Sequence, residues 1–149
     1  MTDTYIEQTA IDHFLNNLNV ESGVPLITFD QNGKPTNVVL PNTDISMEKL
    51  GNRFFVLSWL PNDPEPAGLG TNADNRYDGI FQIDIMTPLG AGKEEAENKQ
   101  LWITKLFNRG RSIDRLTVIK CYRAMHGAEE GYYRTVLRVE ITATLPNLK

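Results

Sequence analysis

The sequence predicts an α+β fold: a mostly antiparallel four-stranded sheet with two helices packed on one face, plus a small N-terminal hairpin or arm. Two observations predict it. Residues 79–85 and 132–145 alternate between apolar and polar side chains, which is the period of a strand with one covered face. Apolar residues recur at helical spacing in residues 3–19 and 93–107. A sheet with one apolar and one polar face is typical of antiparallel strands covered on one side.

Length and composition favour a single domain spanning residues 1–149, because a chain of this size can bury most of its apolar surface. The net charge of −4 argues against a protein that binds nucleic acid mainly through phosphates. The single cysteine, Cys121, cannot form an internal disulfide. The start of the chain lacks the pattern of a signal peptide, and no apolar run has membrane-spanning length. We therefore expect a cytoplasmic site of synthesis and no membrane partner.

The first half of the chain begins with a predicted helix. Residues 4–7 fit a capping box, and the helix is expected to span about residues 3–19. Residues 24–52 are predicted to form an insertion-like hairpin or arm, because Asn32-Gly33 is a strong hairpin signal. Its strands are expected in the β-favouring runs 26–29 and 38–40.

Residues 53–60 are apolar on both faces and fit a well-covered strand. Residues 61–75 contain three prolines and two glycines and show no apolar period. Such a stretch predicts a long surface loop that orders against a neighbouring molecule.

The second half starts with the strand at residues 79–85, which ends at Pro88, Gly90 and Gly92. A helix follows to residue 107, with Glu95 and Lys99 expected as an exposed i,i+4 pair. Residues 115–122 are predicted as the third long strand and residues 126–131 as a turn. Residues 132–145 are predicted as the last strand. Its expected inward side chains are Tyr133, Thr135, Leu137, Val139, Ile141, Ala143 and Leu145.

Arg76-Tyr77-x-Gly79-x-Phe81-Gln82-Ile83-Asp84, then Pro88-x-Gly90-x-Gly92 and an apolar helix, resembles the bacteriophage tail terminator-like (tail completion) proteins. The resemblance covers about residues 54–145. It implies a virion structural protein of the tail, assembled in the host cytoplasm, with no enzymatic activity and no cofactor. It further implies a homo-oligomeric ring, expected to be hexameric, that caps the tail tube, ends its elongation and offers a surface to the head–tail connector. Transient contact with DNA in the lumen is a further expectation.

A ring requires heterologous contacts between subunits, and polar residues with both signs of charge would fix their register. The basic cluster of Arg109, Arg111 and Arg115 is explained first by the dipole of the helix that it follows. The functional alternative is a charged contact with an acidic partner or with DNA passing through a ring. Replacing Arg134 and Arg138 by glutamate is expected to leave the fold intact. The residues predicted to form the subunit or partner interface are Arg76, Gln82, Asp84, Arg134, Arg138, Glu140, Arg109 and Arg111.

No catalytic, metal-binding or cofactor-binding residue is predicted. The glycines near residue 90 lack the spacing of a phosphate loop and fit a strand-to-helix turn. His13 and His126 show no metal-ligand spacing. Two alternative functions stay open. One is a head–tail joining or minor tail protein. The other is a small cytoplasmic ligand-binding or enzymatic domain, which predicts a concave pocket with convergent polar groups. A pocket lined by Asp84, Glu140 and His126 would favour it.

Overall fold

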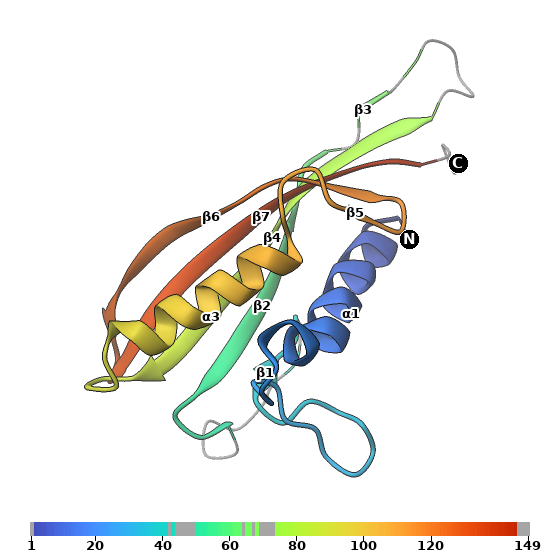
Figure 1. The fold of residues 1–149 in the computed structure, drawn as a ribbon. Coiled ribbons are helices and arrows are strands. Elements are labelled where there is room, and N and C mark those ends of the chain that lie inside the picture. The colour runs from blue at the N-terminus through green and yellow to red at the C-terminus, as the bar shows by residue number, and fades with distance from the viewer. Residues whose placement is uncertain are drawn as a thin grey trace.

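All strands of the described chain belong to one curled sheet, covered on one side by two helices (Figure 1). The computed structural model describes residues 2–41, 43, 50–63, 65–66, 68 and 74–145. Along the chain its elements are α1 (Thr2–Ser22), β1 (Val38–Val39), β2 (Phe54–Pro61), β3 (Glu65–Pro66), β4 (Asn75–Pro88), α3 (Lys93–Leu106), β5 (Ser112–Ile113), β6 (Leu116–Glu129) and β7 (Tyr132–Leu145).

The prediction of a four-stranded antiparallel sheet is wrong. The sheet has seven strands in the order β1-β2-β4-β7-β6-β5, and β3 pairs with β4. It is mixed, because β1 runs parallel to β2 whereas every other pairing is antiparallel. The four long strands are β2, β4, β7 and β6. The three additional strands have two residues each, too few to show a period of two. The α+β class and the two helices agree with the prediction.

The predicted N-terminal hairpin forms in a shorter version, in which Phe29 and Pro35 make an isolated antiparallel bridge. The backbone N–H of Thr36 donates to the Thr28 carbonyl, and that of Asp30 donates to the Lys34 carbonyl, both at 2.8 Å. Asp30 Oδ1 accepts hydrogen bonds from the backbone N–H groups of Asn32 and Lys34 (2.8 and 2.9 Å), and Gly33 takes a positive φ of 79°. The predicted return strand does not pair back along residues 26–29. Val38–Val39 instead aligns in parallel with Phe55 and Val56 of β2. Val38 and Val39 are therefore built into the sheet, with Val38 fully buried.

Helix α1 starts before and ends after its predicted bounds, so Thr4 lies within the helix instead of capping it. Asn19 continues the helix while its side chain holds the chain that follows. Its Oδ1 accepts the backbone N–H of Ile27 and its Nδ2 donates to the Ile27 carbonyl, both at 2.8 Å. The helix ends at Gly23, where φ is 73°. This arrangement fixes residues 24–27 beside the sheet.

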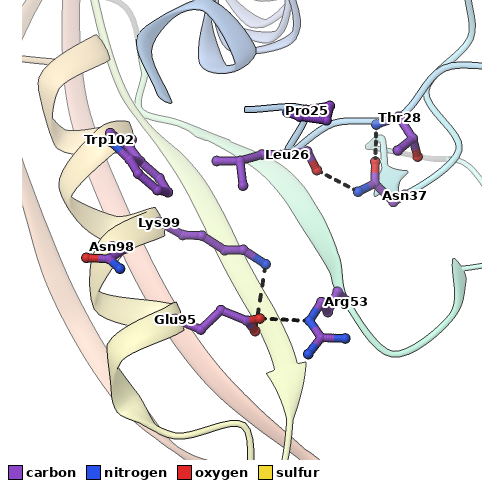
Figure 2. Close-up of a pocket in the computed structure, with 9 residues that line it drawn as sticks. All are labelled: Pro25, Leu26, Thr28, Asn37, Arg53, Glu95, Asn98, Lys99 and Trp102. Atoms are coloured by element: carbon purple, nitrogen blue, oxygen red, sulfur yellow. Dashed lines mark hydrogen bonds and ion pairs between the residues drawn. The ribbon is translucent and has the colours of Figure 1, made fainter. Parts of the chain in front are cut away.

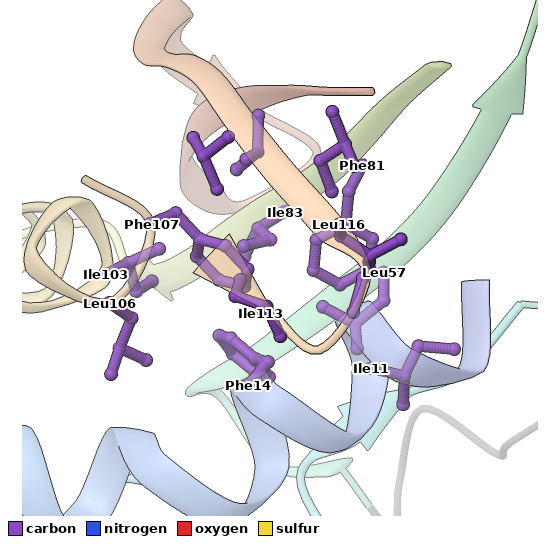
Figure 3. Packing of buried hydrophobic residues seen from close by; sticks show 14 of the residues in the cluster. Ile11, Phe14, Leu57, Phe81, Ile83, Ile103, Leu106, Phe107, Ile113 and Leu116 are labelled. Atoms are coloured by element: carbon purple, nitrogen blue, oxygen red, sulfur yellow. The ribbon is translucent and has the colours of Figure 1, made fainter. Parts of the chain in front are cut away.

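Phenylalanines from the helices and strands form the centre of the core (Figure 3). Phe14 of α1 packs edge-on against Phe55 of β2 with ring centroids 5.4 Å apart. Phe107, just after α3, lies 5.7 Å from Phe81 of β4. All four rings are fully buried, so both helices are attached to the same face of the sheet. The opposite face, called the outer face below, carries no described helix.

Strand β6 extends beyond its predicted end and includes part of the predicted turn. It runs to Glu129, and the turn consists of Glu130 and Gly131, both with positive φ. Register shifts occur between Val118 and Lys120 and again between Arg123 and Met125. These irregularities interrupt the alternation of side chains, which is why the sequence shows only the first half of the strand.

The predicted loop at residues 61–75 lies partly outside the described residues. Of the described part, Pro61 closes β2, residues 65–66 form β3, and Asn75 opens β4. The same holds for the segment 24–52, whose residues 42 and 44–49 lie outside the described chain.

Candidate functional site

The side chains on the outer face of the sheet lie in rows that cross four strands. Ser58 of β2 aligns with Gln82 of β4, which aligns with Arg138 of β7, which aligns with Tyr122 of β6. A row further along the strands consists of Leu60, Ile80, Glu140 and Lys120. Register alone thus brings together residues that lie up to 80 positions apart in the sequence.

A continuous hydrogen-bonded network lies at the centre of the outer face. Arg134 donates from Nε and Nη2 to Asp84 Oδ2 (3.0 and 2.8 Å) and from Nη1 to Glu129 Oε2 (2.9 Å). Gln82 Nε2 donates to Asp84 Oδ1 at 3.0 Å. Arg138 Nε donates to Gln82 Oε1 at 3.2 Å. The network links β6, β7 and β4 through five side chains, and among the described residues the other guanidinium nitrogens of Arg138 have no hydrogen-bond partner.

This network is more than a set of surface charges. Asp84 is only 7% exposed, and the side chain of Arg134 is 25% exposed. Both carboxylate oxygens of Asp84 accept hydrogen bonds, which compensates its removal from water. Val136, aligned with Asp84 on β7, is also buried. The outer face therefore has an ordered polar centre that fixes the shape offered to a neighbour.

Two further ion pairs lie on the outer face away from this centre. Lys120 Nζ lies 3.1 Å from Glu140 Oε2 and stacks over the Tyr122 ring at 5.0 Å. Arg76 Nε lies 3.2 Å from Asp78 Oδ2. The side chains of Lys120 and Arg76 are at least half exposed, so solvent screens these pairs and their effect on stability is small.

Six of the eight predicted interface residues share the outer face: Arg76, Gln82, Asp84, Arg134, Arg138 and Glu140. The structure places Arg109 and Arg111 elsewhere, after the C-terminal end of α3. Arg111 Nη1 donates to the carbonyl of Lys105 in the last turn of that helix, at 3.1 Å. This contact fits the helix-end explanation of the basic cluster.

The contacts of Arg134 change the expectation for the double glutamate substitution. That expectation treated Arg134 as a solvated surface residue. In the structure it neutralises a buried carboxylate, so a glutamate at this position would place a second negative charge against Asp84. Arg138, whose described hydrogen bond goes to the neutral Gln82, is the better position for testing the outer face.

The apolar part of the outer face could not be predicted from the sequence. Tyr122 and Met125 of β6 lie on the outer face and are 36% and 49% exposed, and Leu60 of β2 is 47% exposed. Ile119, at the first register shift, is 45% exposed. The irregular register of β6 hides Ile119, Tyr122 and Met125 from any search for alternation. Exposed apolar side chains beside a polar network are typical of protein interfaces.

The two edges of the sheet are only partly covered. β5 pairs with the first two residues of β6, and the loop before β5 bonds to Val118. On the other edge, β1 pairs with Phe55 and Val56 of β2. Among the described residues, β6 from Ile119 onward and β2 from Leu57 onward have no neighbouring strand at the free edge of the sheet. Such edges can pair with strands of other chains.

The structure does not assemble the pocket of Asp84, Glu140 and His126 that would favour the enzyme alternative. Asp84 lies on the outer face, whereas His126 aligns with Thr135 on the opposite face and bonds to the Tyr133 hydroxyl at 2.8 Å. Burial raises the pKa of the Cys121 thiol to about 11, which disfavours the reactive thiolate. Within the described ranges, no group of three or more His, Cys, Asp or Glu residues is placed to hold a metal ion.

Gly90 and Gly92 both have positive φ and form the turn between β4 and α3, as the strand-to-helix interpretation expects. Neither described helix combines the length and the apolar character needed to span a membrane.

Comparisons with solved structures find other chains with a similar fold. One solved structure matches with a TM-score of 0.66 at 12% identity and covers 100% of this chain and 99% of that chain, which shows a shared fold. A chain described as part of the virion of a native gene transfer agent particle matches with a TM-score of 0.42 at 17% identity. That match covers 88% of this chain and 85% of the other, and its score is too low to support a conclusion. No curated protein matches the chain.

The family model described as phage tail terminator protein matches residues 12–141. The match covers the second half of α1, all of α3, β2, β4 and β6, and β7 as far as Ile141, and it includes every predicted interface residue. The chain therefore belongs to the phage tail terminator proteins and is a structural protein of the phage tail.

Proposed function

We propose that this protein is the subunit of a closed homo-oligomeric ring that caps the phage tail tube, stops its elongation and offers the joining surface for the head–tail connector. The family match over residues 12–141 carries the proposal. The expected ring is hexameric, and its assembly takes place in the host cytoplasm. Binding and shape are sufficient for this role, so no enzymatic activity is needed.

The geometry of the sheet supports ring closure. A closed ring of identical subunits needs two different surfaces that meet at each contact. The chain offers the polar and apolar outer face and two dissimilar open edges, at β2 and β6. The ordered network around Asp84 fixes the register of charged groups on one such surface, and charge complementarity selects the matching partner.

Substitutions on the outer face test this surface through their effect on the oligomeric state. Arg138→Glu reverses a charge at the edge of the network, while Lys34→Glu makes the same change in the exposed 30–34 turn. We expect wild type and Lys34→Glu to form rings visible by negative-stain microscopy and light scattering, on their own or on the tips of tail tubes. Arg138→Glu should be folded by circular dichroism and deficient in rings. Normal ring formation by Arg138→Glu would show that the outer face does not form the contact between subunits.

A further inference from the structure

A pocket of about 400 Å³ lies between α3 and the chain that follows α1, away from the outer face (Figure 2). Asn37 holds the backbone of the pocket wall opposite α3 in place. Its Oδ1 accepts a hydrogen bond from the backbone N–H of Thr28 (3.0 Å), and its Nδ2 donates to the Leu26 carbonyl (2.8 Å). The volume lies within the range of small-molecule sites. Its lining residues come from four segments: Pro25, Leu26, Thr28, Asn37, Arg53, Glu95, Asn98, Lys99 and Trp102.

Lys99 is the unusual member of this pocket. The sequence predicts an exposed i,i+4 pair with Glu95, but Lys99 is only 7% exposed. Its ammonium group lies 4.0 Å from Glu95 Oε2, beyond hydrogen-bond distance, and 5.7 Å from the centroid of the Phe55 ring. No hydrogen bond to it is found among the described residues. In the same described part of the chain, the buried polar atom without a hydrogen bond at this site is Glu95 Oε2, not Lys99 Nζ, so the ammonium group faces the open space of the pocket. Its three donors are available there to an acceptor.

The charges around Lys99 do not balance. Arg53 Nε donates to Glu95 Oε1 at 2.8 Å, so one carboxylate serves two cations. Burial lowers the pKa of Lys99, Glu95 partly restores it, and Arg53 lowers it further. The pocket thus carries one positive charge in excess. Figure 2 shows Lys99 and Glu95 extending from α3 toward Arg53, with Trp102 beside Leu26.

We propose that this pocket binds a carboxylate carried on an apolar body, with Lys99 Nζ donating to the carboxylate and Trp102 and Leu26 contacting the body. A carboxylate supplies an acceptor for the donors of Lys99 Nζ and a negative charge that offsets the excess positive charge. The proposal does not depend on ring formation. The carboxylate can belong to a free small molecule or to an acidic side chain of a second copy of this chain.

Benzoate and its neutral analogue benzamide test the site by calorimetry at constant ionic strength. We expect wild type to bind benzoate at least about tenfold more tightly than benzamide, because a hydrogen bond to a charged group adds about that factor. Lys99→Met keeps the apolar stem and should abolish the preference. Lys105→Met, an exposed position on the same helix, should retain it. No benzoate binding, equal binding of benzamide, or an unchanged preference in Lys99→Met would overturn the proposal.

Nuclear magnetic resonance of the wild type gives a second test that needs no folded variant. The two tryptophans provide an internal comparison, because Trp102 lines this pocket and Trp59 does not. Benzoate should shift the indole N–H signal of Trp102 and leave that of Trp59 in place. Equal shifts of both signals, or none, would contradict the site.

Light scattering identifies the source of the carboxylate. If benzoate and Lys99→Met both weaken self-association, a second copy supplies the group. If neither weakens it while benzoate still binds, the ligand is a free molecule. Both results support the pocket and differ only in the origin of its ligand.

Discussion

Asp84 is the residue on which the outer face depends. Asp84→Asn preserves its shape and removes its charge, so Arg134 would keep Glu129 as an ionised partner but lose Asp84, while three-quarters of its side chain stays buried. We expect the free energy of unfolding to fall by about 1–3 kcal/mol. Urea denaturation followed by circular dichroism measures this loss.

Lys120→Met is the matched control, because the Lys120–Glu140 pair lies on the same face and its lysine is 58% exposed. Solvent screening should keep its effect within about 0.5 kcal/mol. Equal losses in the two variants would show that the network around Asp84 has no special role in stability.

His13 predicts a pH dependence at the contact between the two helices. Its Nε2–H donates to the carbonyl of Leu106 at the end of α3 (2.9 Å), and its ring packs against Phe107. Burial lowers the pKa of His13, the bond to Leu106 opposes this, and the charge of Arg111 lowers it further. The folded state therefore binds the proton less readily than the unfolded state.

It follows that stability is full above the unfolded pKa of 6.5 and falls as the pH drops below it. Thermal unfolding between pH 5 and 8 checks this expectation, with His13→Gln as the comparison. The slope below about pH 6.5 should be smaller in the variant. A variant with the same slope as wild type would assign the dependence to other groups.

For individual residues, the sequence predicts which side chains face outward on β4 and β7 but not which side chains they bond to. The bonds of Arg134 to Asp84 depend on the register of two strands whose residues are 50 positions apart. The burial of Lys99 was equally hidden, because it arises from Phe55 and from the segment 25–28, which lie far away in the chain.

Among the elements, β4 depends on a glycine that admits a large side chain from β2. A Cβ at Gly79 would lie 2.4 Å from Trp59 Cη2, so the indole packs directly on the backbone. Gly79→Ala should destabilise the protein by about 1–3 kcal/mol, because the ring would have to move. Unfolding in urea measures the loss.

A double-substitution cycle with Trp59→Leu isolates the cause of that loss. Once the indole is absent, Gly79→Ala should cost much less, so the two effects should not add. Additive losses would mean that the alanine acts through the backbone of β4 and not through Trp59.

Elements with a long and regular pattern could be predicted, and those formed by distant pairing could not. β7 has its predicted bounds, Tyr132–Leu145, because its alternation is uninterrupted. β1, β3 and β5 exist only through contacts with β2, β4 and β6. The second half of β6 escaped prediction because its register shifts break the alternation.

For the molecule as a whole, one side of the sheet builds the core and the other remains available to partners. The helices bury the four central phenylalanines on the inner side, while the outer face combines an ordered network with exposed Tyr122 and Met125. The family could be inferred from motifs at the β4–α3 junction. The surfaces that contact the tube and the connector have no such motif, so their assignment stays a prediction, as does the single-domain organisation.

The length of assembled tail tubes tests the central claim most directly. Tube protein of the same virus would be polymerised with and without this protein, and tube lengths would be measured by electron microscopy. We predict shorter tubes with a ring at one tip, normal activity for Lys34→Glu and a loss of capping for Arg138→Glu. Tubes of unchanged length, with no ring at their tips in the presence of excess wild-type protein, would contradict the proposed role.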